Sequence, residues 1–125
     1  MKPAENTPLS WSEDRLQQEV VMWFRNKYPR FRGCLYSIPN GGGRSGFEGK
    51  ILKSTGVHAG VFDMCLDMYG KSYKIELKRP NGSNNLSDKQ RAWMVLMQAH
   101  RFECTIWNDL PSLKAYIERI IDDVV

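Results

Sequence analysis

The chain has 125 residues, of which 42% are hydrophobic and 26% are charged. This composition is typical of one globular domain and argues against a disordered or fibrous chain. No apolar run approaches the roughly 20 residues that a membrane-spanning helix needs, and no secretory signal pattern is visible at the N-terminus. We therefore expect a cytoplasmic protein without a membrane partner.

The formal net charge is +4. Clustered Lys and Arg side chains favour DNA because they release counterions from its phosphates, although many soluble proteins carry such a charge without binding nucleic acid. Cys34, Cys65 and Cys104 are far apart and form no Cys-x-x-Cys pair, so a zinc site of normal ligand spacing is not expected. Any metal should be held by oxygen.

Residues 1–9 contain two prolines and no periodic pattern, which predicts a flexible arm before a single domain over residues 10–125. An amphipathic helix is predicted from residue 10 or 12 to about residue 27, ending before Pro29. Its apolar stripe consists of Leu16, Val20, Trp23 and Phe24.

A short strand is expected over residues 34–38, before the glycine-rich loop 40–46. A short helix over residues 47–54 would follow, with Gly56 ending it. Residues 61–68 and 72–79 are apolar-rich stretches joined at residues 69–71, which predicts an antiparallel β-hairpin.

After the hairpin, a second long helix is predicted over residues 87–100, then a strand over 102–107 and a last helix over 110–123. The inner face predicted for the second helix consists of Trp93, Leu96, Met97 and His100. The predicted face of the last helix consists of Leu113, Tyr116, Ile117, Ile120 and Val124. The order predicts an α/β domain with a mixed central sheet covered by helices.

The hairpin carries the candidate chemistry. Apolar and polar residues alternate over residues 73–78, which places Glu76 and Lys78 on one face of a strand. Asp63 lies among apolar neighbours in the partner strand, where a carboxylate needs a partner. A connection of two or four residues puts Asp63 on the same face as Glu76 and Lys78, and one of three residues puts it opposite Leu77; we predict the former.

Two carboxylates on adjacent strands can hold a hard divalent ion such as Mg²⁺. A metal there polarises a phosphoryl oxygen and acidifies water, while a lysine beside it orients that water or stabilises developing negative charge. Asp63, Glu76 and Lys78 are therefore candidate catalytic residues of a phosphodiesterase. The alternative is a surface ion pair between Glu76 and Lys78, which contributes little.

The series Asp63 … Glu76-Leu77-Lys78 resembles the Asp…Glu-x-Lys core of the PD-(D/E)XK superfamily, and the wider pattern is similar to its VRR-NUC branch, the virus-type replication and repair nucleases. The other segments that carry this resemblance, within residues 12–107, are Ser12-Glu13 through Leu16-Gln17, Ile38-Pro39-Asn40-Gly41-Gly42 with Arg44-Ser45, Gly56 to Gly60, Lys78-Arg79-Pro80, and Leu86-Ser87 through Gln90. One departure is Phe62, where such domains usually have proline before the aspartate.

The resemblance implies a restriction-endonuclease-like core, a mixed sheet flanked by helices in the order α-β-β-β-α-β-α, and a Mg²⁺- or Mn²⁺-dependent DNA endonuclease. It also implies an assisting carboxylate from the first helix and a glutamine from the helix after the Glu-x-Lys strand. Glu13 and Gln90 occupy those places, with Glu13 a third metal ligand and Glu19 the other candidate. Capping boxes over residues 10–13 and 87–90 are the structural alternatives for Glu13 and Gln90.

Stand-alone domains of this branch resemble homodimeric Holliday-junction resolvases, which implies a homodimer acting on branched DNA such as a four-way junction. A catalytically silent DNA-binding module with the same fold is one alternative. A nuclease that cuts flaps or a defined restriction site is another.

The loop over residues 40–46 lacks the Gly-Lys-Ser/Thr ending of a P-loop, so no nucleotide cofactor is expected. Its glycines would let backbone N–H groups approach a DNA phosphate, and the alternative is an ordinary surface loop. The DNA-binding candidates are Asn40 and Arg44 in this loop and Lys50, Lys53 and Arg79 on a basic rim.

Overall fold

The computed structural model describes residues 6–39 and 53–123. Its elements are α1 (Glu13–Lys27), the 3₁₀ turn η1 (Pro29–Phe31), β1 (Leu35–Ser37), β2 (Met64–Met68), β3 (Lys71–Leu77), α3 (Asp88–Ala99), β4 (Glu103–Trp107) and α4 (Leu110–Asp122). This order of helices and strands agrees with the sequence prediction. The helix predicted over residues 47–54 lies mostly outside the described residues.

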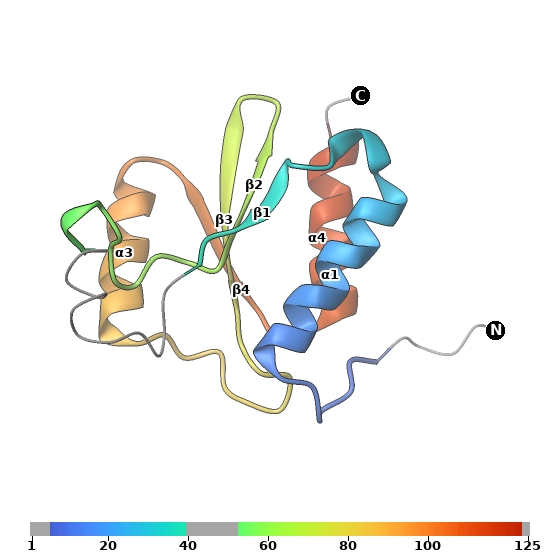
Figure 1. Ribbon diagram of the computed structural model, residues 1–125, viewed down its shortest axis with the longest axis horizontal. Helices are drawn as coiled ribbons and strands as arrows, with labels where there is room; N and C mark the ends of the chain where they lie inside the picture. Colours follow the sequence, from blue (N-terminus) through green and yellow to red (C-terminus); the bar gives the residue numbers. More distant parts are fainter. Residues whose placement is uncertain (1–5, 40–52, 124–125) are drawn as a thin grey trace.

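A mixed four-stranded sheet in the order β1-β2-β3-β4 forms the centre of the fold. β1, β2 and β3 pair antiparallel, and β4 pairs parallel to β3. Figure 1 shows α1 and α4 on one face of this sheet and α3 on the other. The predicted α/β class with a mixed sheet covered by helices is confirmed.

The face covered by α1 and α4 holds the main hydrophobic core. It consists of Leu16, Val20, Phe24, Leu35, Met64, Leu66, Met68, Ile75, Leu77, Leu110, Leu113, Ile117, Ile120 and Ile121. The alternation predicted for β3 is present, because Ile75 and Leu77 belong to this core while Glu76 lies on the face toward α3. Among the described helices, none has the length and apolar character needed to cross a membrane.

The start of α1 differs from the capping box predicted over residues 10–13. Ser12 is the N-cap, and its side chain accepts a hydrogen bond from the Arg15 backbone N–H. Glu13 is therefore the first residue of the helix rather than the third, and the predicted box is wrong. Because Glu13 does not reach back to cap its own helix, its carboxylate is left for other contacts.

The β2–β3 hairpin has a two-residue connection, Tyr69-Gly70, and both residues have positive φ, 55° and 79°. Such a pair is the signature of a type I′ turn, whose twist matches that of the strands. The turn fixes the register with Met64 opposite Ile75. One step further along, Asp63 comes opposite Glu76, as the prediction required.

The second long helix, α3, turns a different face to the sheet from the one predicted. Trp93 is buried, but Leu96 is 48% exposed and His100 is also exposed. The physical reason is that Gln90 points inward, where it bonds Glu76. Because helical neighbours lie three or four residues apart, an inward residue 90 brings residues 93 and 97 toward the sheet, and Met97 is half-buried. Leu96 lies farther round the helix from Gln90, and His100 follows the last helical residue.

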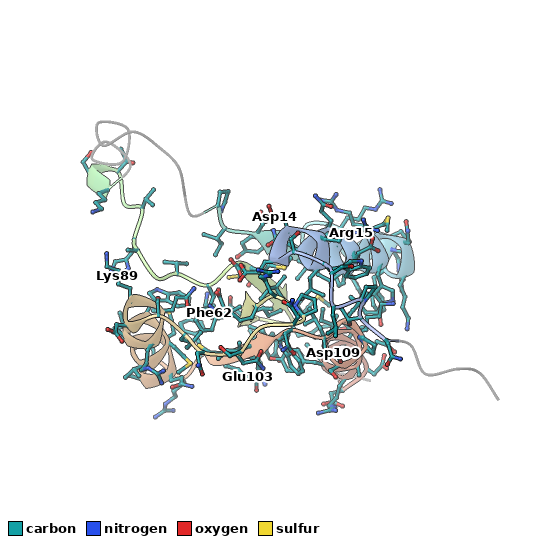
Figure 2. The ribbon with its side chains drawn as sticks, turned by 90° about the horizontal axis from the view of Figure 1, so that it is seen from below. Asp14, Arg15, Phe62, Lys89, Glu103 and Asp109 are labelled. Atoms are coloured by element: carbon teal, nitrogen blue, oxygen red, sulfur yellow. The ribbon has the colours of Figure 1, made fainter. Side chains whose placement is uncertain are left out.

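Phe62 anchors the segment before β2 to α3. Its ring is fully buried and lies 5.2 Å from that of Trp93, centroid to centroid. Figure 2 shows Phe62 on the α3 side of the sheet. Phe62 is thus a packing residue between the sheet and α3.

Candidate active site

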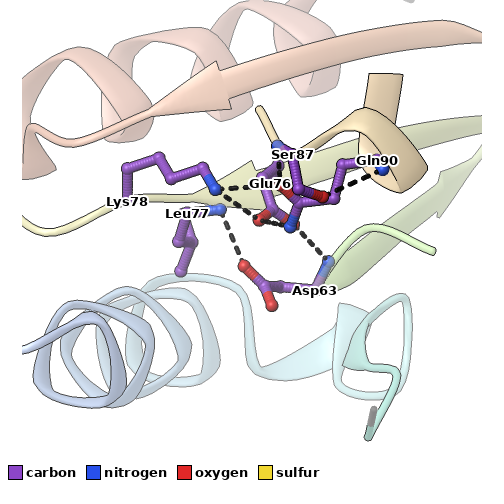
Figure 3. A network of polar contacts seen from close by, with 6 residues as sticks. All are labelled: Asp63, Glu76, Leu77, Lys78, Ser87 and Gln90. Carbon is purple, nitrogen blue, oxygen red and sulfur yellow. Dashed lines mark hydrogen bonds and ion pairs between the residues drawn. The ribbon is translucent and has the colours of Figure 1, made fainter. Parts of the chain in front are cut away.

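Asp63 is fixed at the point where β2 begins. Its backbone N–H donates to Glu76 Oε1 (3.1 Å), and its carboxylate Oδ2 accepts from the Leu77 backbone N–H (2.8 Å). Its carbonyl oxygen accepts from the Ile38 N–H (2.7 Å). The side chain of Asp63 takes the role of a strand carbonyl toward Leu77, so its carboxylate is held beside Glu76 (Figure 3).

Glu76 lies at the centre of the polar cluster and is only 2% exposed. Its Oε2 accepts a hydrogen bond from Gln90 Nε2 at 2.7 Å and forms an ion pair with Lys78 Nζ at 3.4 Å. Within residues 6–39 and 53–123, no other charged side chain is buried. Burying a carboxylate costs free energy unless it is paired and hydrogen-bonded, and Glu76 has both kinds of partner.

Gln90 links Lys78 to Glu76. Its Oε1 accepts from Lys78 Nζ (3.0 Å) and from the Ser87 backbone N–H (3.0 Å), while its Nε2 donates to Glu76. This pattern fixes the orientation of the amide, because a carboxylate requires a donor and an ammonium requires an acceptor. We call Asp63, Glu76, Lys78 and Gln90 the carboxylate–lysine network (Figure 3).

Gln90 also closes the capping box of α3. Its backbone N–H donates to Ser87 Oγ at 3.2 Å, and its side chain accepts from the Ser87 N–H. The capping role and the contact with the candidate catalytic side chains were alternatives at the level of sequence. One side chain makes both sets of bonds.

The pKa of Glu76 is raised from 4.5 to about 7. Burial is the largest cause, followed by the negative charge of Asp63 and a side-chain hydrogen bond with it, and Lys78 opposes the shift. Two adjacent carboxyl groups with too little positive charge around them hold a proton. A divalent cation would compensate the same excess of negative charge.

Glu13 approaches the site from the first turn of α1. Although the residue as a whole is exposed, burial raises the pKa of its carboxyl, and the charge of Asp63 raises it further while Lys78 and Arg79 lower it. These influences place Glu13 near the carboxylate–lysine network, since such interactions weaken with distance. Glu19, the other candidate, pairs instead with Arg15 at 2.8 Å.

Asp63 and Glu76 are two candidate metal-binding residues that contact each other through hydrogen bonds. No group of three or more His, Cys, Asp or Glu side chains is arranged to hold a metal in the part of the chain that the structure describes. The role of Glu13 as a third metal ligand, or as a residue that contacts a metal-bound water, therefore stays a prediction.

Of the candidate DNA-binding residues, Lys53 and Arg79 lie within the described residues. Arg79 is exposed at the end of β3 and is close enough to Glu13 to affect its pKa. Lys53 is exposed on the segment before Gly56. Asn40, Arg44 and Lys50 lie outside the described residues, so their role stays a prediction.

Sequence reasoning missed the backbone donors of the site. The N–H groups of Leu77 and Ser87 hold Asp63 and Gln90 in place. Every residue except proline carries such a donor, so residue identity gives no signal for them. Only the register of the hairpin and the start of α3 could have revealed them.

Comparisons of the chain with protein-family models, with curated proteins and with solved structures find no match. The functional conclusion therefore depends on the residues of the site itself.

Replacing Ser87 by alanine separates the two roles of Gln90. Ser87→Ala removes the acceptor for the Gln90 backbone N–H but keeps the Ser87 N–H that holds the Gln90 side chain. We expect a loss of about 1 kcal/mol in the free energy of unfolding, with the bonds from the Gln90 side chain to Lys78 and Glu76 kept. Urea unfolding measures the first effect, and NMR signals of the Gln90 side-chain amide measure the second. Displaced amide signals at unchanged stability would contradict this separation.

Proposed function

We propose that the chain is a Mg²⁺- or Mn²⁺-dependent DNA endonuclease with a PD-(D/E)XK-type core, similar to the VRR-NUC branch. The observation that carries this proposal is the convergence of Asp63, Glu76, Lys78 and Gln90 where β2 and β3 separate. A surface ion pair, the alternative reading of Glu76 and Lys78, fits less well, because Glu76 is buried and hydrogen-bonded on both oxygens.

The donor set suits a hard cation. Asp63 and Glu76 offer carboxylate oxygens, the ligands that Mg²⁺ and Mn²⁺ prefer. The pKa of Glu76 is raised first by burial and then by the negative charge of Asp63, which a bound cation would offset. A divalent ion bound there supplies positive charge at a phosphoryl oxygen and lowers the pKa of a water molecule. Asp63 and Glu76 would hold the ion, and Glu13 would orient water from the start of α1.

Lys78 supplies the positive charge of the chain itself. Its ammonium is held by Gln90 Oε1 and Glu76 Oε2, so it is oriented before any substrate arrives. A preorganised cation beside a phosphodiester stabilises the negative charge that develops during hydrolysis. Lys78 would also orient the attacking water, and Gln90 would hold Lys78 in place.

The experiment that tests this function is cleavage of labelled DNA by purified protein in Mg²⁺, Mn²⁺ or EDTA. A four-way junction, a flap and a linear duplex of matched sequence should be compared. We expect metal-dependent cutting, with the junction cut fastest. Binding to the junction without cutting in any metal would instead identify a catalytically silent DNA-binding module, and preference for the flap or for one duplex sequence would replace the junction as substrate.

We further propose that two copies of the chain pair through α3, which carries an exposed apolar stripe. The stripe consists of Ala92, Val95, Leu96 and Ala99, and Val95 and Leu96 are 57% and 48% exposed. The stripe is symmetric about Val95 and Leu96, so antiparallel pairing would cover it in both copies. Asp88 at one end and Arg101 just beyond the other would then meet with opposite charge.

Leu96→Glu tests this pairing. A charge at the centre of the stripe should convert the dimer to a monomer, measured as a halving of mass in sedimentation equilibrium. The matched control is Met22→Glu, since Met22 is 53% exposed on α1, away from α3. A wild-type protein that sediments as a monomer, or a Leu96→Glu variant that remains a dimer, would contradict the interface.

A further inference from the structure

Gly60 lies unusually close to α3. Its φ is +90°, and a Cβ atom at this position would lie 2.4 Å from the carbonyl oxygen of Lys89, 2.5 Å from its carbonyl carbon and 2.9 Å from the backbone nitrogen of Gln90. Gly33, Gly56 and Gly70 also have positive φ, but a Cβ there would meet no atom of the described residues within 4 Å. Position 60 therefore favours glycine for two reasons: its positive φ, and the close contact of its backbone with the backbone of Lys89 and Gln90, which leaves no room for a Cβ.

This contact joins the two segments that bring the site together. Gly60 stands three residues before Asp63, while Lys89 and Gln90 belong to the first turn of α3. The neighbouring contact of Phe62 with Trp93 fastens the same segment to the same helix. Figure 2 shows Lys89 at the end of α3 and Phe62 on the side of the sheet that α3 covers.

We propose that Gly60 is a positioning residue: its close packing on the Lys89–Gln90 backbone sets the place of the Gln90 amide between Lys78 and Glu76. The catalytic meaning of this placement rests on the proposed nuclease function, but the placement itself does not. Gly60 touches neither metal nor substrate and acts only through Gln90. This close packing explains why residue 60, three positions before Asp63, is a glycine.

The distances set the size of the effect. A methyl group at position 60 must move from 2.4 Å to an ordinary separation, which requires the segment and the first turn of α3 to part by about 1 Å. The obstacle is backbone, so no side-chain rotation relieves it. The bonds from Gln90 to Glu76 and Lys78, 2.7 and 3.0 Å long, do not survive such a displacement, because hydrogen bonds weaken steeply beyond their normal lengths.

The test compares Gly60→Ala with Gly56→Ala. Gly56 has a φ of +106°, and within residues 6–39 and 53–123 nothing lies within 4 Å of a Cβ placed there, so its alanine variant carries the backbone strain without the clash. We expect Gly60→Ala to lower kcat about 100-fold with KM for DNA nearly unchanged, since a displacement of about 1 Å at a catalytic group has that effect. Gly56→Ala should keep a kcat close to wild type.

A double substitution shows whether Gly60 acts through Gln90. Gln90→Ala and Gly60→Ala combined should be no slower than Gln90→Ala alone, because Gln90→Ala removes the amide that Gly60→Ala displaces. If the two losses multiply, Gly60 does not act through Gln90 and the inference is wrong.

A second readout does not depend on cleavage. In metal-free wild-type protein, the side-chain amide of Gln90 should give a shifted and slowly exchanging pair of proton signals by NMR, because the amide is held by Glu76, Lys78 and Ser87. Gly60→Ala should return this pair to the position of a solvated amide, and Gly56→Ala should not. Unchanged Gln90 signals in folded Gly60→Ala overturn the inference even if the protein cuts no DNA.

Should Gly60→Ala fail to fold, Phe62→Leu takes its place. This variant trims the neighbouring anchor on Trp93 without backbone strain and should cost about 1 kcal/mol in stability. The same displacement of the Gln90 amide signals is expected, and its absence would equally overturn the inference. Failure of the nuclease proposal would appear differently, as wild-type protein with the Gln90 signature and no metal-dependent cleavage.

Discussion

Lys78→Met should lower the single-turnover rate of metal-dependent DNA cleavage by about 100- to 1000-fold, the usual loss when one preorganised charge-stabilising group is removed. Methionine keeps much of the aliphatic chain but loses the ammonium that Gln90 and Glu76 hold. Because the lost charge acts mainly on the transition state, binding of DNA should change far less than the rate. Cleavage of a labelled junction with enzyme in excess measures the rate directly.

The matched control for this variant is Lys74→Met. Lys74 lies on the same strand and the same face, but its ammonium contacts Ser72 Oγ (3.1 Å), Cys65 Sγ (3.7 Å) and the Phe102 ring rather than Glu76. We expect this variant to cut at a rate close to wild type. Equal losses in the two variants would show that general positive charge on this face, and not the placement of Lys78, drives cleavage.

The second large effect concerns stability. Without metal, the free energy of unfolding of the wild-type protein should fall as pH rises from 4.5 to 7, by up to about 3 kcal/mol more than in Glu76→Gln. The pKa of Glu76 is raised to about 7 in the folded protein from an ordinary value of 4.5. Between these values the folded chain retains a proton that the unfolded chain has released. Raising the pH therefore favours unfolding, and the stabilisation is fully present only below pH 4.5.

Urea unfolding of both proteins in EDTA from pH 4 to 8 measures this difference. Glutamine has nearly the shape of a protonated glutamate and does not titrate, so the comparison isolates the charge at position 76. Adding Mg²⁺ at pH 8 should restore stability to the wild type and not to Glu76→Gln, because the ion binds the ionised form. A stability difference that is constant across pH would mean that Glu76 keeps its ordinary pKa.

The hairpin shows what could be predicted from sequence. Strict alternation over residues 73–78 fixed the faces of Glu76 and Lys78, and a connection of two residues at Tyr69-Gly70 was among the predicted lengths. Since side chains alternate with a period of two, these local features determine which residues face each other. Asp63 was found because a carboxylate among apolar neighbours requires a partner.

The orientation of α3 could not be predicted in the same way. Helical spacing placed Leu96 on one predicted face with Trp93 and Met97, but Leu96 belongs equally to a second apolar stripe with Ala92, Val95 and Ala99. The stripe that faces the sheet was decided by Gln90, a polar residue, through its bonds to buried Glu76 and to Lys78. A long-range polar contact outweighed the hydrophobic pattern, and single-helix periodicity does not contain that information.

The backbone contact of Gly60 lay beyond the sequence for a similar reason. Four glycines among the described residues have positive φ, and only Gly60 also packs against another backbone. A turn glycine and a packing glycine look the same in sequence. They differ only in what lies opposite them in space.

Binding of Mn²⁺, followed by electron paramagnetic resonance, tests most directly whether Asp63 and Glu76 together hold a divalent ion. Wild-type protein should bind Mn²⁺ at one saturable site, and Asp63→Asn should lose this site. Asp67→Asn should retain it, because Asp67 lies on β2 but bonds Tyr36 away from Glu76. Equal Mn²⁺ binding by all three proteins would contradict the account.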